Sequence, residues 1–406
     1  MKPIRLAYLV SRYPAISHTF ILREVRTLRQ NGFEIVVASI NAPDRQMQDM
    51  TAAEQEEMQN TFYVKSSGLF GALQATMMTL LTRPLQFFRG LGFALSLGKG
   101  DIKKWLYGLF YFIEALMIGQ WMQKHRLNHI HVHFATPAAT VGMILSRTFP
   151  MTYSMTVHGP DEFYNVKDYY LTQKINYADF ICCISHFARS QLMILSPASD
   201  WDKFEISPLG VNPSIFKPAP FREHPDPFEI VCVGRLVPVK GQHILLKAVE
   251  NLLSQGRQVR LRYIGDGPDR GGLEQQAKPL GKAVRFAGAV NQDQILDFYK
   301  QADVFVLATF AEGVPVVLME AMMMQIPCVT THITGIPELI HPGEGLLVAP
   351  SDVEGLTAAI EALMDSPQLR QDIGRKARAS VLAHYELEKN TLRLGDIFRK
   401  RLSNNI

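Results

Sequence analysis

The sequence predicts an α/β protein with two doubly wound domains, each a parallel sheet covered by helices. Short apolar runs alternate with helical patterns along the chain, and a Pro-rich stretch interrupts this alternation before it restarts. The 406 residues suffice for two cores, and 47% apolar residues is ordinary for a globular protein. We expect a first domain over 1–208, a linker over 209–227, a second domain over 228–385 and a last helix over 386–406.

The first half opens with a strand, a helix and a second strand. An apolar run predicts a strand over 4–10, and a helical pattern follows over 19–30. Asn31 and Gly32 close that helix, and the next strand is expected at 33–40. Later strands are expected at 130–135, 152–158 and 180–185.

The second half restarts the same alternation. Strands are expected at 228–234, 259–265, 284–288, 303–309, 327–331 and 346–350. Helices are expected at 242–254, after Pro268, at 292–302, after Pro315 and from 352 onward. In open parallel sheets, ligands bind at the carboxyl ends of the strands, so the cleft between the two domains is the expected active site.

Charge and cysteine content exclude several classes of function. A net charge of +4 is too small and too diffuse to indicate nucleic-acid binding. The excess of positive charge lies in 65–126, which contains eight Lys and Arg and two acidic residues. The four cysteines, at 182, 183, 232 and 328, fall in apolar runs without zinc-ligand spacing, so we expect reduced core residues. The first apolar run is too short for a secretory signal, which predicts a cytoplasmic protein.

The run from Glu312 to Glu320 carries the clearest chemical signal. Gly313 lets the backbone approach a ligand closely, and Pro315 suits the first turn of a helix. The amides of Val316 and Val317 would then point from a helix N-terminus toward an anion. Two carboxylates would repel an anion, so we expect them to accept hydrogen bonds from hydroxyls. Sugar nucleotides offer both a phosphate anion and hydroxyls.

The stretch 310–340 resembles the donor-site signature of retaining glycosyltransferases of family 4, which have the GT-B fold. Three further pieces stand in the family's order: His158-Gly159 with Asp161, the segment 234–241, and the turn 265–268. Together these motifs span most of the chain, and their order makes the resemblance specific. It implies two Rossmann-like domains facing each other across a cleft, with the last helix crossing back to the first.

The resemblance also assigns roles to individual residues. Arg235 and Lys240 would hold the diphosphate of a nucleotide sugar and meet the charge of the leaving group. Glu320 would bind the ribose hydroxyls, while Glu312 and His158 would face the donor sugar. Gly265 and Gly267 would let the backbone approach the nucleotide. This chemistry implies neither a metal nor a cofactor beyond the sugar nucleotide itself.

Several positions leave alternatives open. The turn 265–268 lacks the third glycine of a dinucleotide fingerprint, since Arg270 stands there, which argues against a dehydrogenase. Asp161 either faces the acceptor or caps the next helix. His131 and His133 share one strand face, but no third ligand indicates a metal site.

Other positions depart from the family pattern. Gln325 and Pro238 replace a common Gly and a common polar residue. The loop 11–20 is similar to the SETF-like loop of polysaccharide-assembly members, with His18 at the usually acidic position.

The basic segment 65–126 has two interpretations. Its charge-free runs are shorter than the about 20 apolar residues that span a bilayer, so no transmembrane helix is predicted. Basic borders and aromatic interiors suit contact with anionic lipid, but ordinary packing in the first domain explains them equally.

Our hypothesis is a retaining hexosyltransferase that transfers a hexose from a UDP- or GDP-linked sugar to a glycan or lipid-linked acceptor. It would act in exopolysaccharide or lipopolysaccharide assembly, in the cytoplasm or peripherally at the inner face of the cytoplasmic membrane. One alternative is a non-catalytic protein that binds a nucleotide sugar or glycan. Another is a hydrolysing nucleotide-sugar epimerase on the same fold.

Overall fold

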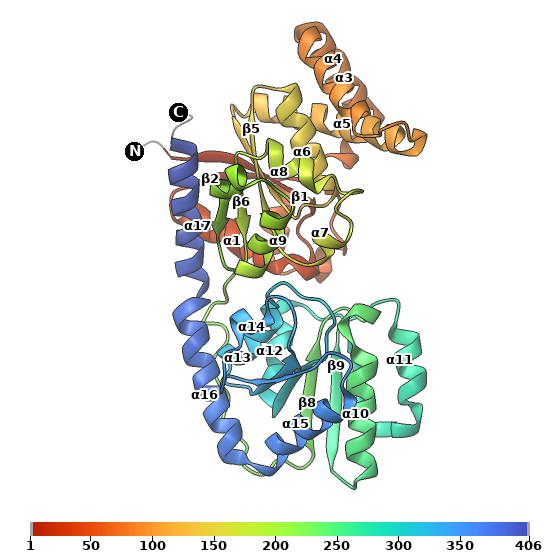
Figure 1. Ribbon diagram of the computed structural model, residues 1–406, viewed down its shortest axis with the longest axis vertical. Coiled ribbons are helices and arrows are strands. Elements are labelled where there is room, and N and C mark those ends of the chain that lie inside the picture. Colours follow the sequence, from red (N-terminus) through yellow and green to blue (C-terminus); the bar gives the residue numbers. More distant parts are fainter. Residues whose placement is uncertain (1–2, 404–406) are drawn as a thin grey trace. The chain divides into compact units, whose positions relative to one another are not determined.

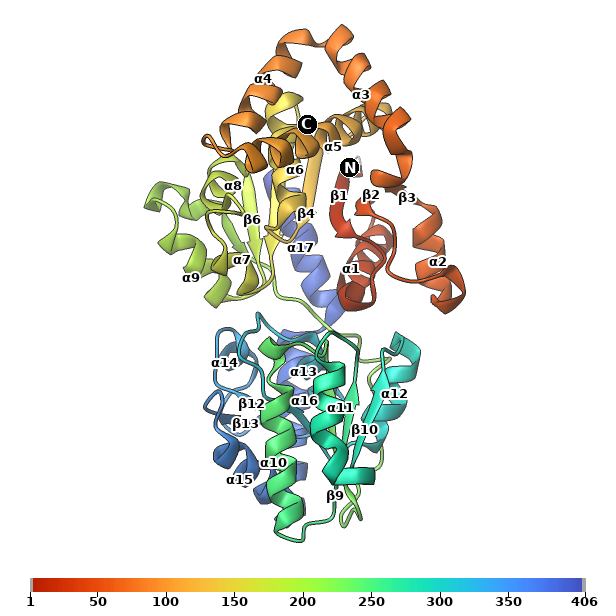
Figure 2. The same ribbon diagram turned by 90° about the vertical axis from the view of Figure 1, so that its right-hand side faces the viewer.

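The computed structural model describes residues 3–403, which divide into two compact units. Unit 1 comprises Met1–Pro208 and Thr391–Ile406, and unit 2 comprises Leu209–Asn390. Each unit is built on one wholly parallel sheet with helices on both faces (Figure 1, Figure 2). The predicted α/β class with two Rossmann-like sheets is confirmed.

The sheet of unit 1 has seven strands in the order β3-β2-β1-β4-β5-β6-β7. The strands are β1 Arg5–Arg12, β2 Glu34–Asn41, β3 Thr61–Tyr63, β4 His129–His133, β5 Thr152–Val157, β6 Phe180–Cys183 and β7 Phe204–Ile206. The sequence did not predict the two edge strands, β3 and β7, because three residues are too few to show a periodic pattern. β4 also ends earlier than expected, since Phe134 adopts a positive φ of 69° and turns the chain out of the sheet.

Two groups of helices cover the two faces of this sheet. The helices are α1 Thr19–Gln30, α2 Ala52–Gln59, α3 Gly68–Thr82, α4 Pro84–Ser96, α5 Ile102–Lys124, α6 Pro137–Thr148, α7 Asp161–Tyr164, α8 Leu171–Tyr177, α9 His186–Ile194 and α17 Leu387–Leu402. One core joins the sheet to α5, α6 and α8, and the other joins it to α1 and α17. The final helix therefore packs on unit 1, and the division between the units falls inside it, after Asn390.

The sheet of unit 2 has six strands in the order β10-β9-β8-β11-β12-β13. They are β8 Phe228–Val233, β9 Val259–Ile264, β10 Val284–Gly288, β11 Val304–Leu307, β12 Cys328–Thr331 and β13 Leu346–Val348. The helices are α10 Gln242–Ser254, α11 Arg270–Ala277, α12 Gln292–Gln301, α13 Val316–Met323, α14 Ile336–Leu339, α15 Val353–Asp365 and α16 Pro367–His384. Short 3-10 helices lie at Ile16–His18, Met47–Asp49, Lys65–Ser67, Ala198–Lys203, Pro238–Lys240 and Lys278–Ala283.

Alternation along the strands of unit 2 sends side chains to two different cores. Val304 and Val306 face the core built with α10, α11 and α15. Phe305, between them, faces the opposite side, where its ring lies 6.1 Å from that of Tyr299 on α12. All four cysteines are buried and free, as expected. No helix within residues 3–403 is both long and apolar enough to cross a membrane.

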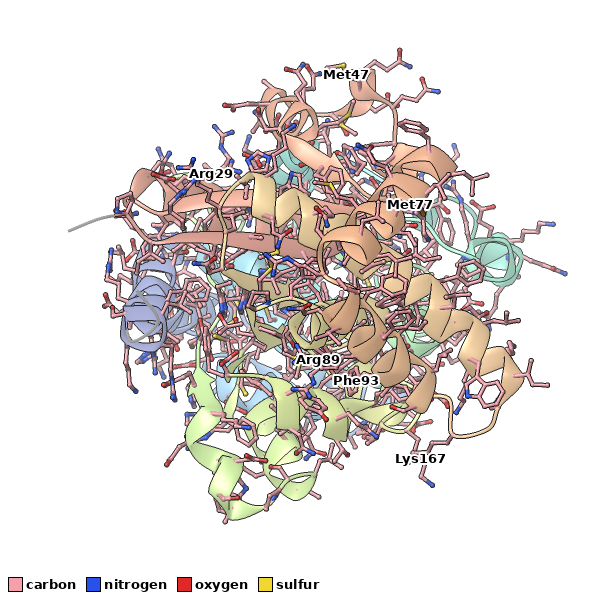
Figure 3. The ribbon with its side chains drawn as sticks, turned by 90° about the horizontal axis from the view of Figure 1, so that it is seen from above. Arg29, Met47, Met77, Arg89, Phe93 and Lys167 are labelled. Carbon is pink, nitrogen blue, oxygen red and sulfur yellow. The ribbon has the colours of Figure 1, made fainter. Side chains whose placement is uncertain are left out.

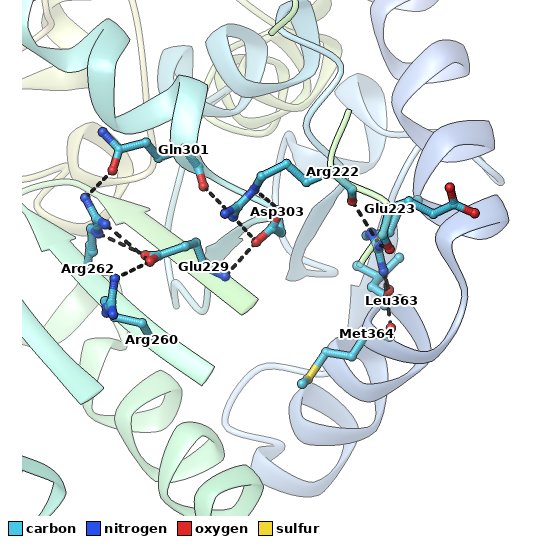
Figure 4. A network of polar contacts seen from close by, with 10 residues as sticks. Arg222, Glu223, Glu229, Arg260, Arg262, Gln301, Asp303, Leu363 and Met364 are labelled. Atoms are coloured by element: carbon cyan, nitrogen blue, oxygen red, sulfur yellow. Dashed lines mark hydrogen bonds and ion pairs between the residues drawn. The ribbon is translucent and has the colours of Figure 1, made fainter. Parts of the chain in front are cut away.

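The segment 209–227, expected as a linker, is instead attached to unit 2 by a network of polar contacts (Figure 4). Arg222 donates to Asp303 Oδ1 at 3.0 Å and to the Gln301 carbonyl at 2.9 Å. The buried Arg370 on α16 donates to the Glu223 carbonyl at 2.7 Å. Proline content correctly indicated irregular backbone, but it carries no information on these contacts with residues more than 75 positions away.

Replacing Phe398 tests how strongly α17 is held on unit 1. Its ring is fully buried and lies 5.0 Å from the ring of His131 and 6.1 Å from that of Phe180. We expect Phe398→Ala to lower the free energy of unfolding by about 3–5 kcal/mol in urea denaturation. Arg393→Ala, on the exposed side of the same helix, is the control and should cost less than about 0.5 kcal/mol. Equal stability of the two variants would contradict this packing.

Candidate functional site

The motifs of unit 2 converge at the carboxyl ends of β8, β9, β11 and β12. The loop after β8 bonds to the loop after β11 through the Phe310 amide, which donates to the Val239 carbonyl at 2.8 Å. It also bonds to the loop after β9, because the Leu236 amide donates to the Asp266 carbonyl at 3.0 Å. Three motifs that are far apart in sequence therefore form one edge of the sheet.

Glycines allow these loops to approach each other. A Cβ at Gly241, where φ is +62°, would stand 1.9 Å from the Ala308 carbonyl oxygen. One at Gly265 would meet the Gly234 carbonyl at 2.0 Å, and one at Gly267 the Leu236 carbonyl at 2.3 Å. Both glycines of the 265–268 turn thus leave room for the neighbouring loop. This packing role is separate from the nucleotide approach that the resemblance implies.

Lys240 and Glu312 form an ion pair at the centre of this edge. Lys240 Nζ donates to Glu312 Oε1, and their side chains are only 23% and 14% exposed. The sequence assigned the two residues to different parts of a ligand and did not predict that they would bond to each other. A half-buried pair of this kind presents a cation and a carboxylate side by side, which suits a ligand with both an anionic group and hydroxyls.

The N-terminus of α13 adjoins this pair through the loop that begins with Glu312. Pro315 is the N-cap, with φ −68° and ψ 120°, one position earlier than the first-turn position expected. Its side chain makes no capping hydrogen bond, and the first amides, including those of Val316 and Val317, lack intrahelical acceptors. Gly313 is buried, and its carbonyl would lie 2.3 Å from a Cβ at Gly335. The helix start is therefore held by backbone packing and remains suited to an anion.

Glu320 lies in the second turn of α13 and is 6% exposed. Tyr299 Oη on α12 donates to its Oε2 at 3.1 Å. Tyr299 was not identified from the sequence, because nothing in the α12 pattern marks one buried aromatic as a partner for a carboxylate. Arg235 follows Gly234 after β8 and is exposed, while its carbonyl accepts from Gln242 Nε2 at 2.7 Å.

His158 lies in unit 1, just beyond β5, and its side chain is 7% exposed. Its ring packs against two aromatic rings, with centroid distances of 5.1 Å to Phe20 and 4.3 Å to Phe134. Burial lowers the pKa of His158 well below its ordinary value, so the ring is neutral at pH 7.

Glu162, which the sequence reasoning missed, holds the backbone of this loop. Its Oε2 accepts from the amides of His158 and Gly159 at 2.5 and 2.8 Å, and its Oε1 accepts from the Ala135 amide. Burial raises the pKa of Glu162 to about 7, while these amide hydrogen bonds oppose the shift. Asp161 does not cap α7 as one alternative proposed, because Pro160 is the N-cap.

The histidines of β4 bond to side chains of the fold. His131 Nδ1 and Nε2 lie 2.7 and 2.8 Å from the hydroxyls of Ser154 and Thr156. Among residues 3–403, no three His, Cys, Asp or Glu side chains gather as metal ligands would.

Comparison with known proteins identifies the part of the chain that contains the motifs of unit 2. Residues 215–380 match the sequence model of the family described as Glycosyl transferases group 1. The chain is 27% identical over 277 residues, 64% of its length and 67% of the relative, to the putative teichuronic acid biosynthesis glycosyltransferase TuaC of Bacillus subtilis. It is 24% identical over 395 residues, 93% of its length and 95% of the relative, to the putative colanic acid biosynthesis glycosyltransferase WcaL of Escherichia coli.

A solved structure shows the same fold over nearly the whole chain. Anabaena HepE, crystallised with UDP, superposes with a TM-score of 0.71 at 17% identity, over 98% of this chain and 100% of that one. At this identity, the likeness concerns the fold alone.

Gly241 tests the close contact between the loops after β8 and β11. Gly241→Ala should destabilise the protein through both the positive φ and the clash with the Ala308 carbonyl. Gly256→Ala is the matched control, since Gly256 has φ +82° but no atom within 4 Å of the added Cβ. We expect the control to cost about 1 kcal/mol and Gly241→Ala about 1–3 kcal/mol more in chemical denaturation. Equal costs would mean that the loops separate freely.

Proposed function

Because residues 215–380 form a glycosyl transferases group 1 domain in a chain with the GT-B fold, the protein is a glycosyltransferase, and we propose that it is a retaining enzyme of family 4. It transfers a hexose from a UDP- or GDP-linked donor to a glycan or lipid-linked acceptor. Its relatives include enzymes named for teichuronic and colanic acid biosynthesis, which places its activity in polysaccharide biosynthesis. The observation that carries the proposal is the Lys240–Glu312 pair beside the N-terminus of α13.

The donor diphosphate would replace Glu312 as the partner of the Lys240 ammonium. Within residues 3–403, the recorded partner of the Lys240 ammonium is Glu312, so a diphosphate that arrives at α13 offers it a second, more highly charged partner. Arg235 adds a planar guanidinium, and the amides of Val316 and Val317 add the positive end of the helix. These fixed charges meet the negative charge that grows on the leaving group, so transfer needs no metal ion.

The two glutamates then take the hydroxyls of the donor. Glu312, released from Lys240, accepts from the sugar ring, and Glu320, oriented by Tyr299, accepts from the ribose. Gly265 and Gly267 let the loop after β9 pack closely against the loop after β8 on this side of the edge. HepE, which shares this fold, is described in complexes with UDP and with UDP-glucose, so the fold accommodates a nucleotide sugar. No residue is assigned as a nucleophile.

Separate substitution of the glutamates tests this division with the UDP- or GDP-hexose that wild type turns over. Glu320→Ala should raise the donor KM about 10-fold or more with little change in kcat, because ribose contacts bind ground state and transition state alike. Glu312→Ala should lower kcat about 10- to 100-fold, because sugar orientation matters most during bond cleavage. Equal effects on KM alone would refute the division, and turnover of no donor would refute the enzyme class proposed.

The segment 65–126 both packs in the first domain and presents an apolar surface, so both interpretations of its sequence apply to it. The second half of α5 belongs to the core, since Leu116 and Met122 are buried. Toward solvent, the same segment presents large apolar side chains, of which Leu69 is 91% and Leu85 83% exposed. Figure 3 views this end of unit 1 and labels Met77 of α3 and Arg89 of α4.

This exposed surface fits peripheral contact with a membrane. The most exposed apolar residues of the segment are Leu69, Phe70, Leu73 and Leu81 of α3, Leu85 and Phe88 of α4, and Ile102 of α5. A cluster of this kind on three successive helices marks an interaction surface. The net positive charge of the segment favours anionic lipid, and a lipid-linked acceptor would be found there.

Vesicle sedimentation tests this contact. Wild-type protein should pellet with phosphatidylglycerol-rich vesicles but only weakly with phosphatidylcholine, since both apolar burial and charge contribute. The double variant Leu69→Glu/Phe70→Glu should lose about 10-fold or more of this binding. Ile194→Glu, at a 76% exposed position on α9, should retain it. Retention by the double variant, or equal loss in Ile194→Glu, would refute the proposed surface.

A further inference from the structure

A buried row of polar side chains in unit 1 leads to the ring of His158. Tyr8 Oη donates to Glu24 Oε1 at 2.8 Å, and the same oxygen lies 3.2 Å from His133 Nε2. On its other side, the His133 ring places Nδ1 3.0 Å from His158 Nε2. The row therefore runs from β1 through α1 and β4 to the loop after β5.

The chemistry of Glu24 determines which ring nitrogens carry hydrogen. Its contact with His133 is electrostatic, at ion-pair distance, without the alignment of a linear hydrogen bond. An ionised carboxylate offers only lone pairs, so it favours hydrogen on His133 Nε2. In the neutral ring, Nδ1 of His133 is then an acceptor and His158 Nε2 must donate to it. The remaining nitrogen of His158, Nδ1, is left with a lone pair.

The surroundings of His158 leave its ring little freedom to turn away from this arrangement. Glu162 holds its amide, and the rings of Phe20 and Phe134 lie against it. Its Nδ1 is buried and has no hydrogen-bond partner within the described part of the chain. A buried acceptor without a donor is costly, so a ligand that supplies an O–H or N–H group there is favoured. A phosphate or carboxylate oxygen would meet a lone pair instead.

We propose that Glu24 and His133 are positioning residues that hold His158 in the tautomer with hydrogen on Nε2, so that its Nδ1 accepts a hydrogen bond from a substrate hydroxyl. This inference rests on the proposed function for the identity of the ligand, a sugar, but not for the tautomer. In this tautomer His158 binds a hydroxyl group through Nδ1.

The tautomer can be measured in the free protein by NMR at pH 7, using protein labelled with 15N at histidine. Two-bond nitrogen–proton correlations show which ring nitrogen carries hydrogen, and His158→Gln identifies the signals by their loss. We expect hydrogen on His158 Nε2. In His133→Phe, which keeps a ring at the same place, both tautomers should appear. His129→Phe, the same substitution two residues earlier on β4, should leave the His158 tautomer unchanged.

Three results would overturn the proposal. The first is hydrogen on His158 Nδ1 in wild type, which a doubly protonated His133 would cause. The second is a mixture of His158 tautomers in wild type. The third is the same spectrum in His133→Phe and His129→Phe. The wild-type measurement decides the first two even if a variant fails to fold.

Kinetics with a hexose donor give a second readout. We expect His133→Phe to lower kcat about 10-fold and His129→Phe to retain wild-type kcat. Equal kcat in the two variants would overturn the positioning role. If no donor is turned over, the function proposed above is refuted. The NMR measurement still decides the tautomer, because it does not depend on activity.

Discussion

The ion pair between Lys240 and Glu312 is the interaction on which the candidate site depends. It joins the loop after β8 to the loop after β11, where Gly241 leaves room for the backbone at Ala308. A half-buried pair of this kind neutralises both of its charges. In the function proposed above, a diphosphate would replace Glu312 as the partner of the ammonium, and the carboxylate would then be available for a sugar. Binding and alignment of the donor would thus be coupled.

The two units use buried polar groups in different ways. In unit 2, the carboxylate of Glu320 accepts a hydrogen bond from the hydroxyl of Tyr299, so one side chain orients another. In unit 1, Glu162 is fully occupied by three backbone amides and acts on the shape of the loop that carries His158. The first arrangement fixes a side chain, and the second fixes the backbone next to the ring of His158.

Sequence periodicity predicted much of this architecture. The helix over 19–30 matches α1, and the strand at 33–40 differs from β2 by one residue at each end. The motifs at the strand ends of unit 2 were located correctly because strand polarity alone brings them to one edge. The docked segment 209–227, by contrast, depends on Arg370, which lies about 150 residues away from it. Such contacts leave no local pattern in a sequence.

The partners of the site residues escaped prediction for the same reason. Tyr299, Glu24 and Glu162 occupy ordinary helical positions, and only the folded chain shows that each contacts a residue of the candidate site or one next to it. Glu162 directly follows the recognised motif of His158, Gly159 and Asp161. Its acidic side chain at that position was the local sign in the sequence that it could hold this loop.

Calorimetric titration of UDP and GDP tests the central claim, that the edge formed by Arg235, Lys240 and α13 binds a nucleoside diphosphate. We expect one of the two nucleotides to bind wild type, and Arg235→Ala to weaken that binding about 10-fold or more. The control Arg285→Ala, an exposed arginine on β10, should bind as wild type does. Binding of neither nucleotide, or equal binding by all three proteins, would contradict the account.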